Sequence, residues 1–211
     1  MHNNNNDIYT EVAEYYSEKL AAHGETAQGV DWNGEQGQNL RFEQLYKLID
    51  ARLQFSINDL GCGYGALYSF VADRQASFNY TGIDIAENMI LAAKQRYKES
   101  ANANFIVSNE PDKVADYSVA SGIFNVRFNR LDGEWDAYIE ETLDLLDRTS
   151  LRGFAFNCLT SYSDAEKMRE NLYYADPCKL FDFCKRRYSK DVALLHDYGL
   201  YEFTIIVRKN V

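Results

Sequence analysis

The sequence predicts an α/β fold with a doubly wound, mainly parallel sheet. Residues 53–71 indicate a strand, a tight glycine turn and a helix, because alternating apolar positions give way to helical spacing. A second strand pattern at 78–84 ends in an acidic residue, and residues 117–124 are apolar enough to be buried on both faces, as a central parallel strand must be. With 211 residues, the chain is most simply one domain.

Composition and charge narrow the classes of function. Hydrophobic residues make up 46% of the chain and charged residues 26%, ordinary globular values that disfavour disorder. The net charge of −10 argues against nucleic acid or an anionic membrane as partner, because both are bound largely through clustered Lys and Arg. No apolar run approaches the ~20 residues of a membrane helix, and the polar start lacks a signal-peptide pattern. The cysteines lack a CxxC pair and a histidine at ligand spacing, so we expect reduced thiols, a cytoplasmic location and no metal site.

The turn after the first strand carries the strongest functional signal. Gly61, Gly63 and Gly65 stand at alternate positions, where the backbone takes conformations closed to residues with a Cβ and a ligand can approach closely. The helix that opens after Gly65 directs unpaired N–H groups and a partial positive charge at the same place. This arrangement predicts a cradle for a nucleotide-like ligand.

Two acidic residues bear on which nucleotide is bound. The pattern from Gly61 to Ala66 also satisfies the loose dinucleotide fingerprint, so a nicotinamide cofactor stays an alternative. Asp59 precedes the first glycine by two residues, where a carboxylate repels a pyrophosphate but suits a ligand with a cationic end. Asp84 ends the second strand, 23 residues after Gly61, and such a carboxylate can accept both hydroxyls of a ribose.

Three motifs follow one another in order along the chain. They are Asp59-Leu-Gly-Cys-Gly-Tyr-Gly65, Gly82-Ile-Asp84-Ile-Ala-Glu-Asn-Met89 and Asp116-Tyr-Ser-Val-Ala-Ser-Gly-Ile-Phe-Asn125. In these motifs the sequence resembles the class I S-adenosylmethionine (SAM)-dependent methyltransferases. The resemblance implies SAM as cofactor and S-adenosylhomocysteine (SAH) as product. It also implies a seven-stranded sheet in the order 3-2-1-4-5-7-6, with an antiparallel last strand and helices before the first strand.

The N-terminal part is expected to be helical. Apolar residues at helical spacing predict helices at 7–22 and 40–49, and residues 24–37 between them have no periodicity and are expected to form a loop. In the family that the motifs resemble, such helices close over the cofactor. We therefore expect a helical cap at 1–52 and a SAM-binding core at 53–211.

The later elements also follow from local patterns. Apolar spacing predicts a helix at 89–97 and a third strand at 104–108. A long helix at 133–146 has one apolar and one acidic face, and an apolar run at 153–159 is the expected fifth strand. Asp176-Pro177 starts another helix well, with the Asp as N-cap and the Pro at the first helical position.

Cofactor contacts are expected at the carboxyl ends of the strands, where ligands of doubly wound sheets bind. Asn109 and Glu110 either contact the adenine edge or form a simple turn before Pro111. The expected cofactor-binding residues are Arg41, Asp59, Gly61, Cys62, Gly63, Gly65, Asp84, Ile85, Met89, Asn109, Glu110, Ser121 and Gly122.

For each of Arg41, Trp32 and Asn125, the sequence allows either a role in ligand binding or a structural role. Arg41 either pairs with the methionyl carboxylate of SAM or forms a surface salt bridge. Trp32 either stacks on adenine or walls off the acceptor, or is a half-buried anchor. Asn125 either orients the acceptor through its amide or caps the next turn.

The chain ends in two β runs at 191–209 around a turn near Tyr198, which predict an antiparallel hairpin. His196 and Asp197 lie at the end of the first run and are the candidate general base and its orienting carboxylate. A capping or packing role for His196 is the alternative. Tyr162 and Tyr198 are expected to line the acceptor pocket from two loops.

These observations predict a metal-independent methyltransferase that acts on a nitrogen or oxygen of a small molecule, with nitrogen marginally favoured. A non-catalytic SAM-binding module, acting as a sensor or partner subunit, is the first alternative. A nicotinamide oxidoreductase is the second, although the chain has no residues left for the substrate domain that such an enzyme usually needs.

Overall fold

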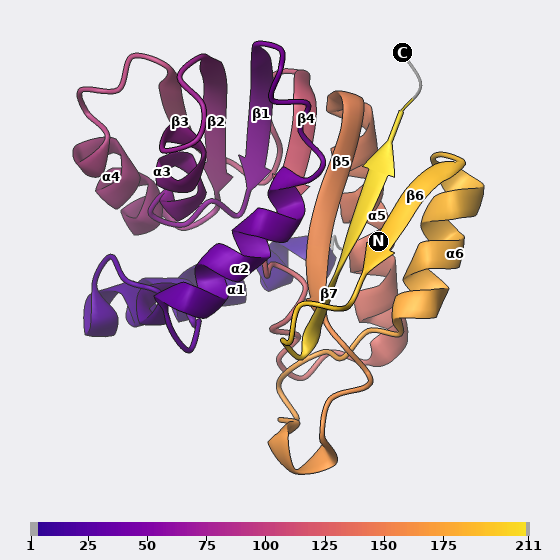
Figure 1. Ribbon diagram of the computed structural model, residues 1–211. Coiled ribbons are helices and arrows are strands. Elements are labelled where there is room, and N and C mark those ends of the chain that lie inside the picture. Colours follow the sequence, from indigo (N-terminus) through magenta and orange to yellow (C-terminus); the bar gives the residue numbers. More distant parts are fainter. Residues whose placement is uncertain (1–3, 210–211) are drawn as a thin grey trace.

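The fold is a seven-stranded sheet in the order β3-β2-β1-β4-β5-β7-β6 (Figure 1). The computed structural model describes residues 4–209. β7 is antiparallel to both of its neighbours, and the remaining pairs are parallel. The strands are β1 (Phe55–Leu60), β2 (Phe78–Asp84), β3 (Ala103–Val107), β4 (Ala115–Ala120), β5 (Ser150–Leu159), β6 (Asp191–Leu195) and β7 (Glu202–Arg208). This topology confirms the predicted fold class and strand order.

Helices cover both faces of the sheet. One apolar cluster lies between the sheet and α2, α3 and α4, and the other lies between the sheet and α5 and α6. The helices are α1 (Asn4–His23), α2 (Glu35–Tyr46), α3 (Ala66–Ala72), α4 (Glu87–Arg96), α5 (Asp132–Arg148) and α6 (Pro177–Arg187), with short 3₁₀ turns η1 (Gln28–Val30) and η2 (Ala165–Lys167).

The central strands are buried on both faces because their side chains alternate between the two clusters. In β5, Phe154 and Phe156 join the cluster on the α5 side, and Ala155 joins the cluster on the α2 side. All three side chains are fully buried. The continuous apolar pattern of this strand therefore reflects a sheet that is covered by helices on both sides.

The N-terminal helices lie near the carboxyl ends of the central strands (Figure 1). α1 contacts α4 and η1, and α2 contacts α3, β5 and β7. Within residues 4–209, no helix is long and apolar enough to cross a membrane. The predicted cap at 1–52 and core at 53–211 include residues 1–3 and 210–211, which lie outside the described part of the chain.

Several predicted element boundaries were wrong, and two of them were off by four residues or more. The second helix begins at Glu35 and not at residue 40, because its first turn is polar and carries no apolar periodicity. The fourth strand ends at Ala120 and not at residue 124, because Gly122 takes a φ of 78° and turns the chain. Phe124 is still fully buried, so its apolar character reflects core packing after the strand has ended.

Candidate functional site

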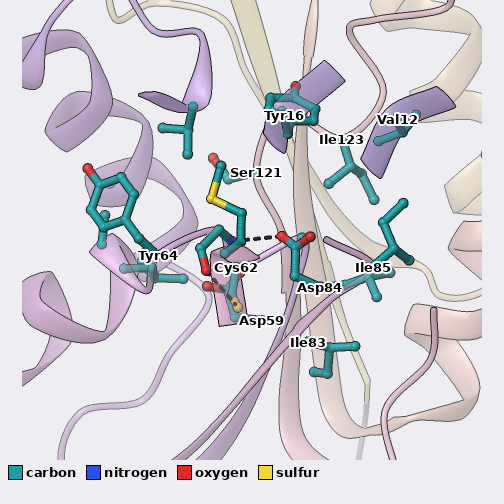
Figure 2. Close-up of a pocket in the computed structure, with 18 of the residues that line it drawn as sticks. Val12, Tyr16, Asp59, Cys62, Tyr64, Ile83, Asp84, Ile85, Ser121 and Ile123 are labelled. Carbon is teal, nitrogen blue, oxygen red and sulfur yellow. Dashed lines mark hydrogen bonds between the residues drawn. The ribbon is translucent and has the colours of Figure 1, made fainter. Parts of the chain in front are cut away.

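A cavity with about 1030 Å³ of empty space, part of it open to solvent, lies where β1, β2 and β4 end. This is the point where the strand order of the sheet reverses, which is the usual ligand site of such sheets. Figure 2 shows Val12 and Tyr16 on one side of the cavity and Asp59 and Asp84 on the other. The predicted residues that line it are Trp32, Asp59, Gly61, Cys62, Gly63, Asp84, Ile85, Met89, Asn109, Ser121 and Gly122.

The glycine turn forms the floor of this cavity. Its three glycines all have positive φ, as the local motif predicts. A Cβ on Gly61 would lie only 2.3 Å from Cγ2 of Ile123, so both the backbone conformation and the space require glycine. The N–H groups of Gly61 and Cys62 donate to the carbonyl of Ile83 at 2.7 and 3.0 Å, and this fixes the turn against the end of β2.

Asp84 presents its carboxylate to the glycine turn from the last position of β2. It accepts hydrogen bonds from the backbone N–H groups of Gly63 and Ala86, each at 2.9 Å, and the bond to the glycine turn is drawn in Figure 2. Burial raises the pKa of Asp84, and the hydrogen bonds from Ala86 and Gly63 partly offset the rise. The two N–H donors therefore hold the orientation of the carboxylate, whose oxygens keep further lone pairs for a ligand.

Asp59 is a second carboxyl group at the cavity, and only 2% of its surface is exposed. The hydroxyl of Tyr80 donates to its Oδ2 at 2.5 Å. Burial is the main cause that raises the pKa of Asp59 to about 7, against the lowering effect of this hydrogen bond. A ligand cation next to Asp59 would favour the charged carboxylate, so the site suits a ligand with a positive group.

Ser121 and Gly122, after β4, form the wall opposite β2. The N–H of Gly122 donates to Oδ1 of Asn157 at 2.7 Å, and Nδ2 of Asn157 lies 3.3 Å from Oγ of Ser121. Asn157 is fully buried in β5. Sequence reasoning missed Asn157, because nothing in an apolar strand pattern marks the one polar side chain that fixes a neighbouring loop.

α1 belongs to the predicted cap, but sequence reasoning did not identify which of its side chains line the cavity. Tyr9, Val12 and Tyr16 line the cavity, and their spacing places them on one face of the helix. Burial raises the pKa of Tyr9 and of Tyr16, so both hydroxyls stay protonated. The available signal was the helical spacing of these residues, which was used only to predict the helix.

Comparisons with known proteins agree with this geometry. Residues 57–148 match the family model described as a methyltransferase domain. The chain is 64% identical over 163 residues to Rv1506c of Mycobacterium tuberculosis (strain ATCC 25618 / H37Rv), a provisionally named methyltransferase, and the match covers 77% of this chain and 98% of that protein. This chain belongs to the class I SAM-dependent methyltransferase family.

Solved methyltransferase structures share the fold at low sequence identity. The N-methyltransferase NodS from Bradyrhizobium japonicum WM9, in complex with SAH, has a TM-score of 0.65 at 15% identity, with 93% of this chain and 97% of NodS covered. DhpI in complex with SAH has a TM-score of 0.63 at 13% identity, with 94% of this chain and 95% of DhpI covered. The family membership removes the nicotinamide oxidoreductase alternative.

In this methyltransferase, Arg41 does not line the cavity. Its guanidinium donates to both carboxylate oxygens of Glu202, at 2.6 Å each. The pair is largely shielded from solvent, with exposed side-chain fractions of 11% for Arg41 and 1% for Glu202. Arg41 thus forms a salt bridge, as one reading predicted, but a buried one rather than one on the surface.

Other predicted residues of the methyltransferase also have positions outside the cavity lining. Gly65 is the N-cap of α3. Glu110 is exposed and pairs with Arg148 at 3.1 Å. Asn125 is buried, and its Oδ1 accepts from the N–H of Leu159 at 3.1 Å, which fits the structural reading better than an acceptor contact.

The catalytic pair and the two tyrosines predicted for the acceptor side of the methyltransferase do not line the cavity. His196 and Asp197 are exposed and follow β6, which is the edge strand of the sheet. Tyr162 is 68% exposed, with its ring centroid 5.9 Å from that of His196, and the Tyr198 hydroxyl lies 3.1 Å from Oγ1 of Thr204. In residues 4–209 there is no group of three or more His, Cys, Asp or Glu side chains that could hold a metal ion.

Proposed function

We propose that this chain is an enzyme that transfers the methyl group of SAM to a nitrogen or oxygen of a small-molecule acceptor, with nitrogen favoured. The observation that carries the proposal is the Asp84 carboxylate, which is held by the Gly63 and Ala86 N–H groups at the edge of the cavity. A carboxylate fixed in this way suits the two hydroxyls of a ribose.

The cavity fits SAM by the chemistry of its residues. Asp84 would hold the ribose, and Asp59 would favour the cationic end of the methionyl group through its nearby negative charge. Gly61 and Gly63 would let the ligand approach the backbone, a space that a Cβ would fill. Ile85, Met89 and Asn109 lie on the adenine side in this assignment.

Bound SAM supplies a methyl group on a sulfonium, which is already a good leaving group. The chain would contribute alignment of the acceptor and removal of water, since most of the described lining is apolar or aromatic. Among the described lining residues there is no histidine. This supports an acceptor that needs little help to lose a proton, such as a neutral amine, and the name of NodS, an N-methyltransferase, agrees with this choice.

Two further features belong to the proposal. Residues 1–52 act as the helical cap, which is supported by the contribution of Val12, Tyr16, Val30 and Trp32 to the cavity wall. The enzyme works in the cytoplasm, where thiols stay reduced. Cys62, Cys158 and Cys184 are buried and unpaired, as is usual for such a compartment.

The test combines binding with turnover. Calorimetry with SAH should give a one-to-one complex, and isotope-labelled SAM incubated with a mixture of small amines, phenols and carboxylic acids should yield SAH and a labelled product. Binding without turnover in any such mixture would favour the non-catalytic SAM-binding module. Absence of SAH binding by the folded chain would overturn the proposed function itself.

A further inference from the structure

The Arg41–Glu202 pair joins the N-terminal cap to the far half of the sheet. Glu202 is the first residue of β7, and because β7 is antiparallel to β5, it lies opposite Leu159, where β5 ends. Two parallel hydrogen bonds connect its carboxylate to the guanidinium of Arg41, on α2. This bidentate geometry fixes the plane of the guanidinium as well as its position.

The guanidinium in turn stacks on Trp32. The central carbon of the guanidinium lies 3.9 Å from the centroid of the indole ring, a close cation–π contact. Trp32 is partly exposed and precedes α2 in the loop that follows η1. The indole of Trp32 is therefore held by Arg41 of α2, and Arg41 is held in turn by Glu202 of β7.

The six-membered ring of the indole meets the loop after β4. A Cβ on Gly122 would lie 2.4 Å from Cζ2 and 2.6 Å from Cη2 of Trp32, so only a glycine allows the ring to come this close. Gly122 is fixed from behind by Asn157. Glu202, Arg41, Trp32 and Gly122 therefore form one continuous stack that ends in the cavity wall.

Stability alone does not account for the ion pair. A buried salt bridge often contributes no more to stability than apolar residues of the same volume, because both charges lose their hydration. What apolar residues do not reproduce is a planar cation whose orientation against an indole is fixed by a bidentate carboxylate. The bidentate geometry of the Arg41–Glu202 pair is therefore better explained by a role in holding the indole of Trp32 in place.

We propose that Glu202 is a positioning residue that acts through Arg41 to hold Trp32 against Gly122, where the indole forms the acceptor-side wall of the methyl-transfer site. The role of the wall rests on the proposed function, whereas the stack itself does not. Trp32 in this assignment walls off the acceptor and does not stack on adenine. Glu202 and Arg41 touch neither ligand.

Tryptophan fluorescence gives a direct readout of this stack. The chain has two tryptophans, and Trp135 is fully buried, so a soluble quencher such as acrylamide reaches Trp32 far more readily. In Glu202→Gln we expect the quenching constant to rise about twofold, because the loss of the cation–π contact frees the indole. Asp182→Asn, which breaks the exposed pair of Asp182 with Arg186, is the matched control and should leave quenching unchanged.

Binding of SAH links the stack to the site. Because Gly122 borders the sulfonium end of the cofactor in the proposed assignment, the indole that it contacts also closes off that end, and Glu202→Gln should raise the Kd of SAH about three- to tenfold. In a Trp32→Ala background, which removes the ring that Arg41 stacks on, the same change should have no further effect, because both substitutions act on the same wall. An additive effect in the two backgrounds would overturn the positioning role. Unchanged quenching in folded Glu202→Gln would overturn it as well.

A second variant keeps the test decisive if Glu202→Gln fails to fold. Arg41→Lys keeps a positive charge for Glu202 but removes the planar group that stacks on the indole, so it should raise quenching as Glu202→Gln does. Wild-type quenching in Arg41→Lys would overturn the proposal. Failure of the wild-type chain to bind SAH would instead overturn the proposed function, and the quenching results would still decide whether Glu202 positions Trp32.

Discussion

The hydroxyl of Tyr80 donates a 2.5 Å hydrogen bond to the buried carboxyl group of Asp59, two residues before the glycine turn. Asp59 belongs to β1 and Tyr80 to β2. The pair thus places an ionisable group with a raised pKa between two central strands, next to the cavity. Such a group lowers the stability of the fold at every pH at which the unfolded chain would release its proton.

Asp59→Asn should stabilise the chain at neutral and alkaline pH. Because burial raises the folded-state pKa of Asp59 to about 7, the unfolded chain loses this proton first as the pH rises. The folded state therefore loses stability from about pH 4 to about pH 7 and stays less stable above that range. We expect the Tm of Asp59→Asn, relative to wild type, to rise by about 2 °C or more between pH 5 and pH 8. An equal difference at both pH values would contradict the raised pKa.

Asp84→Ala should weaken SAM and SAH binding by roughly 1–3 kcal/mol, through the loss of charge-assisted hydrogen bonds to the ribose. Asp84→Asn is the matched control, because its amide oxygen can still accept from one of the two N–H groups that Asp84 now binds. Its loss of affinity should therefore be smaller. Calorimetry measures both variants, and an unchanged affinity in Asp84→Ala would remove Asp84 from the site.

Three glycine-to-alanine variants should separate the free-energy cost of a steric contact at the new Cβ from the cost of a positive φ. Gly133→Ala meets nothing within 4 Å and has no positive φ, so its unfolding free energy should change by less than about 1 kcal/mol. Gly199→Ala has open space but a φ of +73° and should lose about 1–2 kcal/mol. Gly61→Ala combines a φ of +76° with the contact to Ile123 and should lose about 2–4 kcal/mol. Urea denaturation measures the series, and equal losses at Gly199 and Gly61 would mean that the contact with Ile123 costs nothing.

His196→Ala tests the predicted general base. Because His196 is exposed and does not line the cavity, we expect turnover within about threefold of wild type, whereas loss of a general base costs about 10²-fold or more. Initial rates over pH 6–9 measure the effect. A large loss with unchanged SAH affinity would show that His196 reaches the acceptor in the working enzyme and would restore its predicted role.

The sequence predicted the parts of the site that depend on local order. Gly61 and Gly63 lie in one turn and Asp84 ends a strand that pairs with the strand before that turn, so their spacing alone specifies them. The hairpin pattern at 191–209 predicted the antiparallel pairing of β6 with β7, whereas the place of β7 between β5 and β6 followed only from the family resemblance, because it has no local signal.

The sequence could not predict the contacts made between distant elements. Asn157 fixes Gly122 from a position 35 residues later in the chain, and Glu202 binds Arg41 from 161 residues later. In the sequence, Glu202 is an acidic residue at the start of an apolar strand, which is typical of many strand boundaries. Only the folded topology, which places α2 beside β7, shows that its carboxylate is buried against Arg41. The sequence therefore left a ligand contact and a surface salt bridge as alternatives for Arg41, because its protein partner could not be recognised.

The separation of Arg41 and Glu202 also bears on how the molecule is made. During synthesis, α2 leaves the ribosome long before β7 exists, and until then Arg41 has no carboxylate to bind and Trp32 no stacked cation above it. Domains acquire structure from the N-terminus as they emerge, but here the wall at Gly122 is finished only by β7, which follows the glycine turn by more than one hundred residues. A nascent chain that already contains the whole glycine turn is therefore still without its completed pocket, which can close only after β7 has been made.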